Sequence, residues 1–177
     1  LGHLHDILST TYNNNYMSMW TSHLQTIDSS QPWSSHLNYV TSRSNNVLSQ
    51  INNQVAPTPF NITSNAPLSV NGSSASIVGD GWVNVRNIRL AGGGELEINW
   101  TDNNSWQVAV PVSPGENTVV LEAIDFSGDV IGSDTITVNN TSTLEPASAT
   151  NIAISEVMYH PSDPTAAEIA AGFPTDD

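Results

Sequence analysis

The sequence predicts a mainly β protein with an α-helical N-terminal segment, in which the β part is an antiparallel sandwich of about seven short strands. Three observations predict this fold class. Apolar residues recur at helical spacing over residues 1–55 and alternate at strand spacing over residues 67–139. Two Pro-containing polar stretches separate these regions from each other and from the end of the chain.

The N-terminal segment, residues 1–55, is predicted to contain three helices, the first of which is the end of a helix with the sequence LGHLHDIL. The next helix has one apolar stripe at steps of three and four, which consists of Tyr12, Tyr16, Met19, Trp20, His23, Leu24 and Ile27. The last helix begins near Pro32, a residue tolerated in a first turn. Its stripe, interrupted only by a small serine, consists of Trp33, Leu37, Val40, Ser44, Val47, Leu48 and Ile51.

These single stripes cannot close a core by themselves. We therefore expect them to pack on a surface that precedes Leu1, or on the sandwich. If neither packing forms, we expect the helices to fray or self-associate.

Residues 56–66 are a predicted linker, because three prolines in and beside this polar stretch cannot continue a helix. In residues 67–139, turn sequences such as GDG, AGGG, TDNN, SPGEN and FSGD separate short alternating runs. No helical pattern lies between these runs, which disfavours a parallel sheet. The apolar faces of three predicted strands are Leu96–Ile98–Trp100, Trp106–Val108–Val110–Val112 and Val119–Leu121–Ala123.

The stretch PGENTVVLEAIDFSGDVIGSDTITV supplies the last two predicted strands and carries five acids and no base. We expect its apolar side chains to close the core and its acids to face water, where charge discourages pairing between chains. Residues 140–150 form a second predicted linker. Residues 151–177 begin with IAISEVMY, which alternates as one strand and is predicted to start a domain that is cut at Asp177.

The chain is strongly acidic, with 17 acids against three arginines and no lysine, and its net charge is −14. Residues 66–140 hold nine acids and two bases, whereas residues 1–65 hold two acids and one base. This charge disfavours nucleic acid and anionic membranes as partners. Without cysteine there is no disulfide or thiolate site. No apolar run is long enough to span a bilayer, and an Asp-, Asn-, Ser- and Thr-rich surface suits an extracellular setting.

The three regions together resemble bacterial CotH-type kinase-like proteins with a lamin-tail domain. YMSMWTSHLQTI and HLNYVTSRSNNVLSQI are similar to the last helices of the kinase-like domain. GDGWVNVRNIRL and the strands after it resemble immunoglobulin-like modules, and ISEVMYHP resembles the opening strand of a lamin-tail domain. The resemblance implies an immunoglobulin-like sandwich in a secreted or surface-anchored multidomain protein. It also implies that the kinase residues lie upstream of this sequence.

No catalytic, cofactor-binding or metal-binding residue is assigned. AGGGEL lies between strands with no helix after it, so it does not match a phosphate-binding loop. Asp125, Asp129 and Asp134 offer oxygens to calcium, but the spacing is not that of an EF-hand. The favoured interpretation is that Asp125 and Ser127 shape a turn in which Gly128 takes a positive φ. Glu95 and Glu97 are expected on a solvated face.

The histidines and tryptophans are assigned structural roles. His3 and His5 face different sides of a helix, which argues against a shared metal ion. Trp20, Trp33, Trp100 and Trp106 are predicted to lie in cores, and Trp82 is the tryptophan expected to be exposed and able to stack on a sugar. The N-x-[ST] matches, such as NIT, NGS, NWT, NNS and NNT, are expected by chance in such an Asn-rich chain.

The sequence thus predicts a non-catalytic spacer or interaction module with no cofactor. The alternatives are part of a phosphotransferase whose active site lies upstream, or a calcium- or carbohydrate-binding module. The expected partners are neighbouring domains of the same chain, with a cell-surface protein or glycan as a further candidate and no nucleic acid or membrane span. The expected location is extracellular or at the cell surface.

Overall fold

The computed structural model describes residues 1–148, 150–152 and 165–172. Residues Leu1–Pro146 form one compact unit, which contains three helices and two β-sheets. Ala147–Asp177 form a second unit, in which the described helix is α4 (Ala166–Ala170). The predicted strand IAISEVMY, and with it the resemblance of ISEVMYHP to a lamin-tail domain, lies outside the described residues.

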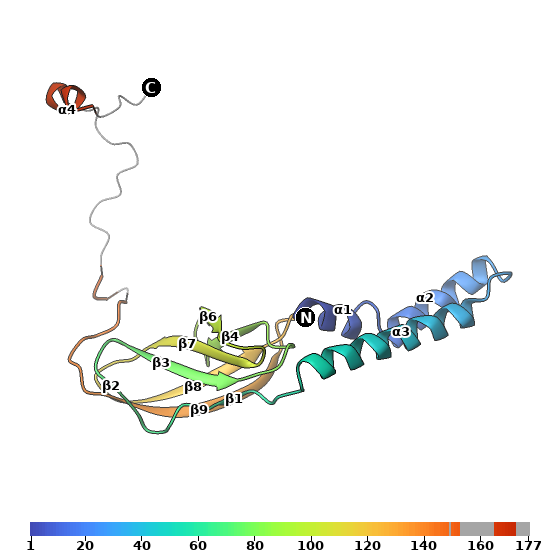
Figure 1. Ribbon diagram of the computed structural model, residues 1–177, viewed down its shortest axis with the longest axis horizontal. Helices are drawn as coiled ribbons and strands as arrows, with labels where there is room; N and C mark the ends of the chain where they lie inside the picture. The colour runs from blue at the N-terminus through green and yellow to red at the C-terminus, as the bar shows by residue number, and fades with distance from the viewer. Residues whose placement is uncertain (149, 153–164, 173–177) are drawn as a thin grey trace. The chain divides into compact units, whose positions relative to one another are not determined.

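The three predicted N-terminal helices are present as α1 (Gly2–Ser9), α2 (Asn14–Ile27) and α3 (Trp33–Gln54). Asn13 caps α2, because its side-chain oxygen accepts a hydrogen bond of 2.8 Å from the backbone N–H of Tyr16. Pro32 stands immediately before α3, where its missing N–H costs no helical hydrogen bond. Figure 1 shows α2 and α3 lying side by side as a hairpin, with α1 next to them.

The predicted stripe of α3 is covered as expected. Val40 and Ile51 are buried, and the other members of the stripe are half-buried. The predicted stripe of α2 is mostly uncovered in the described part of the chain, so the prediction that Trp20 lies in a core is wrong. The covered residues of α2 are Met17, Ser18, Thr21 and Leu24, whereas Tyr16, Met19, Trp20, His23 and Ile27 are exposed.

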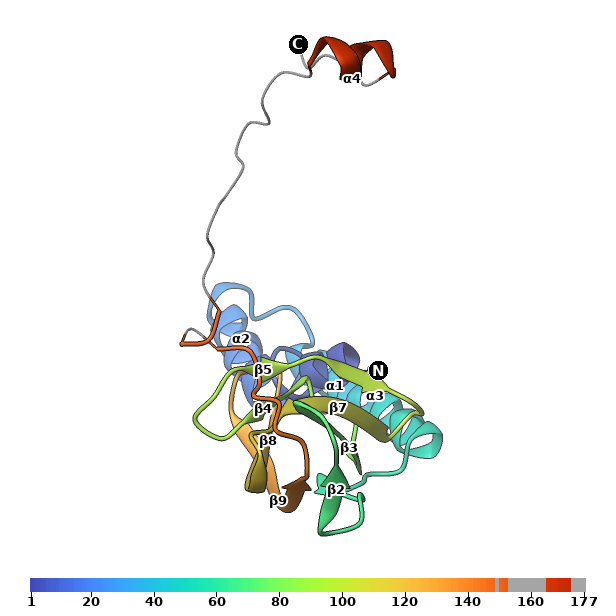
Figure 2. The same cartoon turned by 90° about the vertical axis from the view of Figure 1, so that its left-hand side faces the viewer.

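The nine described strands form two sheets, in the orders β1-β3-β7-β6 and β2-β9-β8-β4-β5. Figure 2 shows these sheets end-on, with the helices behind them. The strands are β1 (Asn61–Ile62), β2 (Leu68–Val70), β3 (Ser74–Asp80), β4 (Asn87–Leu90), β5 (Glu95–Leu96), β6 (Ile98–Trp100), β7 (Ser105–Pro111), β8 (Gly115–Ile124) and β9 (Val130–Asn140).

This strand order is that of an immunoglobulin-like sandwich. If β1 and β2 are two halves of strand A, then β3, β7 and β6 correspond to B, E and D of one sheet. In the other sheet β9, β8 and β4 correspond to G, F and C, and β5 extends it. The predicted fold class, mainly β with an N-terminal helical segment, is therefore confirmed.

Three details of the strand prediction need correction. There are nine described strands instead of about seven, because two-residue strands lack a periodic signal. β2 pairs with β9 in parallel, with Leu68 opposite Val138, so the sandwich is not wholly antiparallel. ELEINW is two strands in two sheets, because the chain crosses the sandwich between Leu96 and Ile98.

The core lies between the sheets and follows the predicted alternation. The side chains on the inner faces of β7 and β8 are at most 5% exposed, namely Trp106, Val108, Val110, Val119, Leu121 and Ala123, and Val112 beyond β7 is 1% exposed. Phe60 stacks on Trp106 with ring centroids 5.2 Å apart. Burial of such apolar surface stabilises the fold by about 25 cal/mol per Å².

Candidate functional site

The beginning of α1 and the end of α3 pack on one end of the sandwich. Gly2 lies so close to the strand-connecting loops that a Cβ there would be 2.7 Å from the Phe126 ring and 2.7 Å from the carbonyl oxygen of Val83. His3 meets Phe126 edge-on, with ring centroids 4.8 Å apart. These contacts join helices and sandwich into one unit and place loop residues next to helical ones.

Trp82 is part of this junction, so the prediction that it is the exposed tryptophan is wrong. Its indole N–H donates a hydrogen bond of 2.9 Å to the carbonyl oxygen of Val55, just after α3. His5 lies edge-on to the same indole, with centroids 4.7 Å apart. Burial lowers the pKa of His5 below its ordinary value, and the nearby Asp6 carboxylate partly offsets this shift. The neutral form of His5 is therefore favoured in the folded junction.

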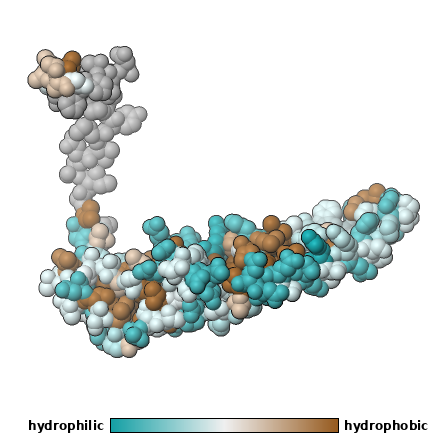
Figure 3. Space-filling view, viewed as in Figure 1, coloured by the Kyte–Doolittle hydropathy of each residue, from teal (hydrophilic) through white to brown (hydrophobic). Residues whose placement is uncertain are grey.

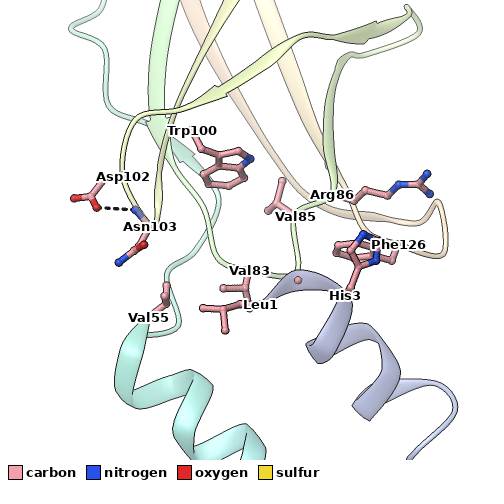
Figure 4. Close-up of a pocket in the computed structure, with 11 residues that line it drawn as sticks. Leu1, His3, Val55, Val83, Val85, Arg86, Trp100, Asp102, Asn103 and Phe126 are labelled. Atoms are coloured by element: carbon pink, nitrogen blue, oxygen red, sulfur yellow. Dashed lines mark hydrogen bonds between the residues drawn. The ribbon is translucent and has the colours of Figure 1, made fainter.

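A cleft opens where the helices meet the loops. Its volume is about 590 Å³, within the range of small-molecule sites. Figure 4 shows Trp100 pointing into it from one side, and Leu1, Val55 and Val83 facing it from the other. The residues that line the cleft are Leu1, Gly2, His3, Val55, Val83, Val85, Arg86, Trp100, Asp102, Asn103 and Phe126.

Trp100 is 38% exposed, which corrects its assignment to the sandwich core. It lies directly opposite Trp106 in the β6–β7 pairing, so both indoles are on the same face of the sheet. Trp106 is in a central strand and fully buried, whereas Trp100 ends the edge strand β6 and extends into the cleft. Alternation alone could not separate the two residues. The polar turn TDNN directly after Trp100 was the available signal that the strand ends there.

Polar residues also belong to the lining of the cleft. Asp102 accepts a hydrogen bond of 2.7 Å from the backbone N–H of Asn103. Within the described part of the chain, the side chains of His3, Arg86 and Asn103 and the indole N–H of Trp100 have no hydrogen-bond partner. The cleft therefore combines the aromatic side chains of Trp100, Phe126 and His3 with donors and acceptors that a ligand can use.

A second uncovered surface lies on α2. We call it the α2 stripe, and it consists of Tyr16, Met19, Trp20, His23 and Ile27. Trp20 lies between Tyr16 and His23 along the helix, with ring centroids 6.4 and 6.2 Å away. The exposed fractions of Met19 and Ile27 are 55% and 69%. Figure 3 shows apolar side chains gathered near the tip of the helical hairpin and over its junction with the sandwich.

The acids considered for calcium shape backbone instead. One Asp125 oxygen accepts hydrogen bonds from the backbone N–H groups of Ser127 (2.8 Å) and Asp129 (2.9 Å). Gly128 has φ +92°, as predicted for this turn. An oxygen of Asp134 accepts from the backbone N–H of Ile62 at 2.7 Å. Among the residues that the structure describes, no three His, Asp or Glu side chains gather in a metal-binding group.

The remaining predicted candidates lie apart from the cleft. Glu95 and Glu97 are exposed, as expected for a solvated face. His36 meets Trp33 edge-on along α3, with ring centroids 5.7 Å apart. Over the described ranges, no helix has the length and apolarity required to cross a membrane.

Comparison with known proteins adds little to this geometry. No protein-family model and no curated protein matches the chain. Among solved structures, the fibronectin(III)-like modules of Clostridium thermocellum CbhA align at 10% identity over 48% of this chain and 99% of theirs, with a TM-score of 0.35.

Two further solved structures align with part of the chain. The SGBP-B protein of the Bacteroides ovatus mixed-linkage glucan utilization locus, in complex with a mixed-linkage heptasaccharide, aligns at 21% identity over 48% of this chain, with a TM-score of 0.33. The alignment spans 24% of that protein. The SrpA adhesin of Streptococcus sanguinis aligns at 20% identity over 63% of this chain and 64% of the adhesin, with a TM-score of 0.33. The fold class of this chain rests on its own strand order.

Proposed function

We propose that this chain is a non-catalytic spacer and interaction module of a secreted or surface multidomain protein. In this proposal the helices dock on a neighbouring domain and the sandwich holds that domain at a fixed orientation. On the basis of the CotH-type resemblance, we propose that the neighbour is a kinase-like domain. Its phosphotransferase residues would then lie outside this sequence.

The observation that carries the proposal is the uncovered α2 stripe. α2 packs inward through a face that includes Met17, Thr21 and Leu24, and it leaves Trp20 44% exposed. Contiguous exposed apolar side chains mark interaction sites in soluble proteins. The cost of exposing a tryptophan, a tyrosine, a methionine and an isoleucine together supports a partner that covers them.

The chemistry of the stripe favours a protein partner. Residues 7–27 contain no Asp, Glu, Lys or Arg. Helices that bind membrane surfaces carry Lys and Arg on their polar face, and nucleic-acid sites need basic residues for the phosphates. An uncharged aromatic and aliphatic stripe on a helix instead fits a groove between elements of another protein domain.

The test is the accessibility of Trp20 to a neutral quencher, acrylamide. We expect Trp20 fluorescence to be readily quenched in this chain alone and shielded in a chain extended by the proposed neighbouring domain. A version in which only Trp20 is retained, with the other four tryptophans changed to phenylalanine, isolates its signal if its circular dichroism matches that of the parent. Equal quenching in both proteins would refute docking through the stripe. Mg-ATP turnover by this chain alone would refute the non-catalytic assignment.

A further inference from the structure

We propose that the cleft between the helices and the sandwich end binds a neutral saccharide, with Trp100 as the stacking surface. This inference names a ligand for the interaction module of the proposed function, but it rests on residues distinct from the α2 stripe. Its failure and the failure of domain docking are therefore separable.

Trp100 is placed where a ligand in the cleft can stack on its ring. The ring ends an edge strand at one end of the sandwich, where the opposing sheet does not bury it, and it is 38% exposed. Val55, Val83 and Val85 face the same cleft, so a ligand that enters meets an indole on one side and aliphatic groups on the other. A ring-shaped ligand with an apolar face matches this slot.

Polar residues in the cleft lining can bind the hydroxyl groups of a sugar. Asn103 offers amide donors and an acceptor, Asp102 offers carboxylate oxygens, and Arg86 offers guanidinium donors without an ion-pair partner among the described residues. A sugar ring combines a C–H face with hydroxyl groups on its edge. The hydroxyl groups both donate and accept, so this mixed lining satisfies them whereas a hydrocarbon ligand would leave the polar groups unused.

The charges of the lining residues and of the whole chain favour an uncharged ligand. Of the residues that line the cleft, one side chain is acidic (Asp102) and one is permanently basic (Arg86), so these two charges cancel locally. The whole chain has a net charge of −14 and repels polyanions. An uncharged saccharide is therefore preferred over a uronic-acid polymer. Cleavage of a glycosidic bond uses a pair of carboxyl groups in most enzymes, and the lining supplies a single one, so the site is suited to binding.

The location supports ligand binding on general grounds. The lining comes from the starts and ends of helices and from the connections β3–β4, β6–β7 and β8–β9, which converge at one end of the sandwich. Loops held by a rigid sandwich are where immunoglobulin-like domains place their binding residues. A volume of about 590 Å³ is in the range of small-molecule sites.

The test is calorimetric titration of the complete chain with three probes: cellohexaose, mannohexaose and the chitin hexasaccharide. We expect at least one of them to bind, and Trp100→Ala to weaken that binding by about fivefold or more, as expected for loss of an aromatic contact. Tyr39→Ala is the matched control, because Tyr39 is an exposed aromatic residue on α3 that lies outside both the cleft lining and the α2 stripe, and the affinity of this variant should equal that of the parent. Arg86→Ala and Asn103→Ala, both at exposed positions, should each weaken binding without loss of folding.

Three results would contradict the proposed saccharide site. If none of the three neutral probes binds at about 10 mM, the site is not a saccharide site of useful affinity, and the proposal is overturned. Binding that survives both Trp100→Ala and Arg86→Ala places the sugar elsewhere and also overturns it. Preference for an oligogalacturonate over all neutral probes would refute the choice of a neutral ligand. Trp100→Phe, which keeps a ring, should recover part of the affinity if Trp100→Ala fails to fold.

Discussion

At the scale of single residues, the packing of Trp106 explains several sequence features at once. The indole is fully buried, stacks on Phe60 and lies opposite Gly79 in the β3–β7 register. A Cβ on Gly79 would collide with the Trp106 ring and with the carbonyl oxygen of Asn61. Gly79 is therefore required by the close approach of Trp106 and Asn61, although it lies within a strand, where glycine is otherwise unfavourable.

We predict that Gly79→Ala destabilises the sandwich by about 1–3 kcal/mol, the usual cost of overpacking a well-filled core. Urea unfolding followed by tryptophan fluorescence measures the change. Gly72→Ala is the matched control, because a Cβ at Gly72 would meet no atom within 4 Å and its φ is not in the left-handed region. The control should stay within about 0.5 kcal/mol of the parent, as surface substitutions do. Equal losses in the two variants would refute the collision at Gly79.

At the scale of elements, the pairing of α2 with α3 shows where sequence periodicity stops being informative. The largest apolar residues of α2 form a stripe, but short polar bonds fix the face that packs. Thr41 on α3 donates to the side chain of Asn14 at 2.8 Å, and Ser44 donates to the carbonyl oxygen of Tyr12 at 3.0 Å. Trp20 lies on the uncovered side of α2 and is 44% exposed. Helical periodicity identified the helices but could not identify the neighbour of each face.

The strands also include runs that the sequence predicted correctly and one run that it did not. Runs with strict alternation, such as the one containing Trp106 and Val110, were predicted correctly because one face is buried between two sheets. ELEINW alternates equally well, yet the chain crosses between sheets within it. The crossing depends on long-range pairing of Leu96 with Ile88 and of Ile98 with Val108, and a local pattern does not contain that information.

The junction of α1 with the sandwich should weaken at acidic pH. Burial lowers the pKa of His5 in the folded state below its ordinary value of 6.5. The unfolded chain therefore binds more protons in this window, so stability falls as the pH drops through about 6.5 towards the folded pKa. Melting temperatures measured between about pH 7.5 and 5.5 should decrease, and His5→Gln should flatten the decrease.

The control for the pH experiment is His36→Gln, which removes another helical histidine that lies edge-on to a tryptophan but far along α3 from the sandwich. Its pH dependence should follow that of the parent. If both variants show the same slope as the parent, protonation of His5 does not govern the junction.

At the scale of the whole molecule, the cleft and the charge depend on features that no single segment contains. The cleft brings together Leu1, Val55, Trp100 and Phe126, which are separated by dozens of residues in the sequence. The sequence pattern therefore pointed to Trp82 and not to Trp100, because it contains no sign that α3 ends beside Trp82. The charge, in contrast, was fully readable, since it is a sum over composition and needs no contacts.

The acidic surface should make the fold more stable in salt. With 17 acids and three arginines, repulsion between like charges exceeds the ion pairing, and the described residues contain one salt bridge, Arg89–Glu122 at 2.7 Å. Raising NaCl from about 10 to 300 mM shortens the screening length several-fold and weakens that repulsion. The melting temperature measured by calorimetry should rise. In Glu95→Gln/Glu97→Gln, which removes two exposed acids, the rise should be smaller. A melting temperature that falls with salt would show that attractive pairs dominate the electrostatics.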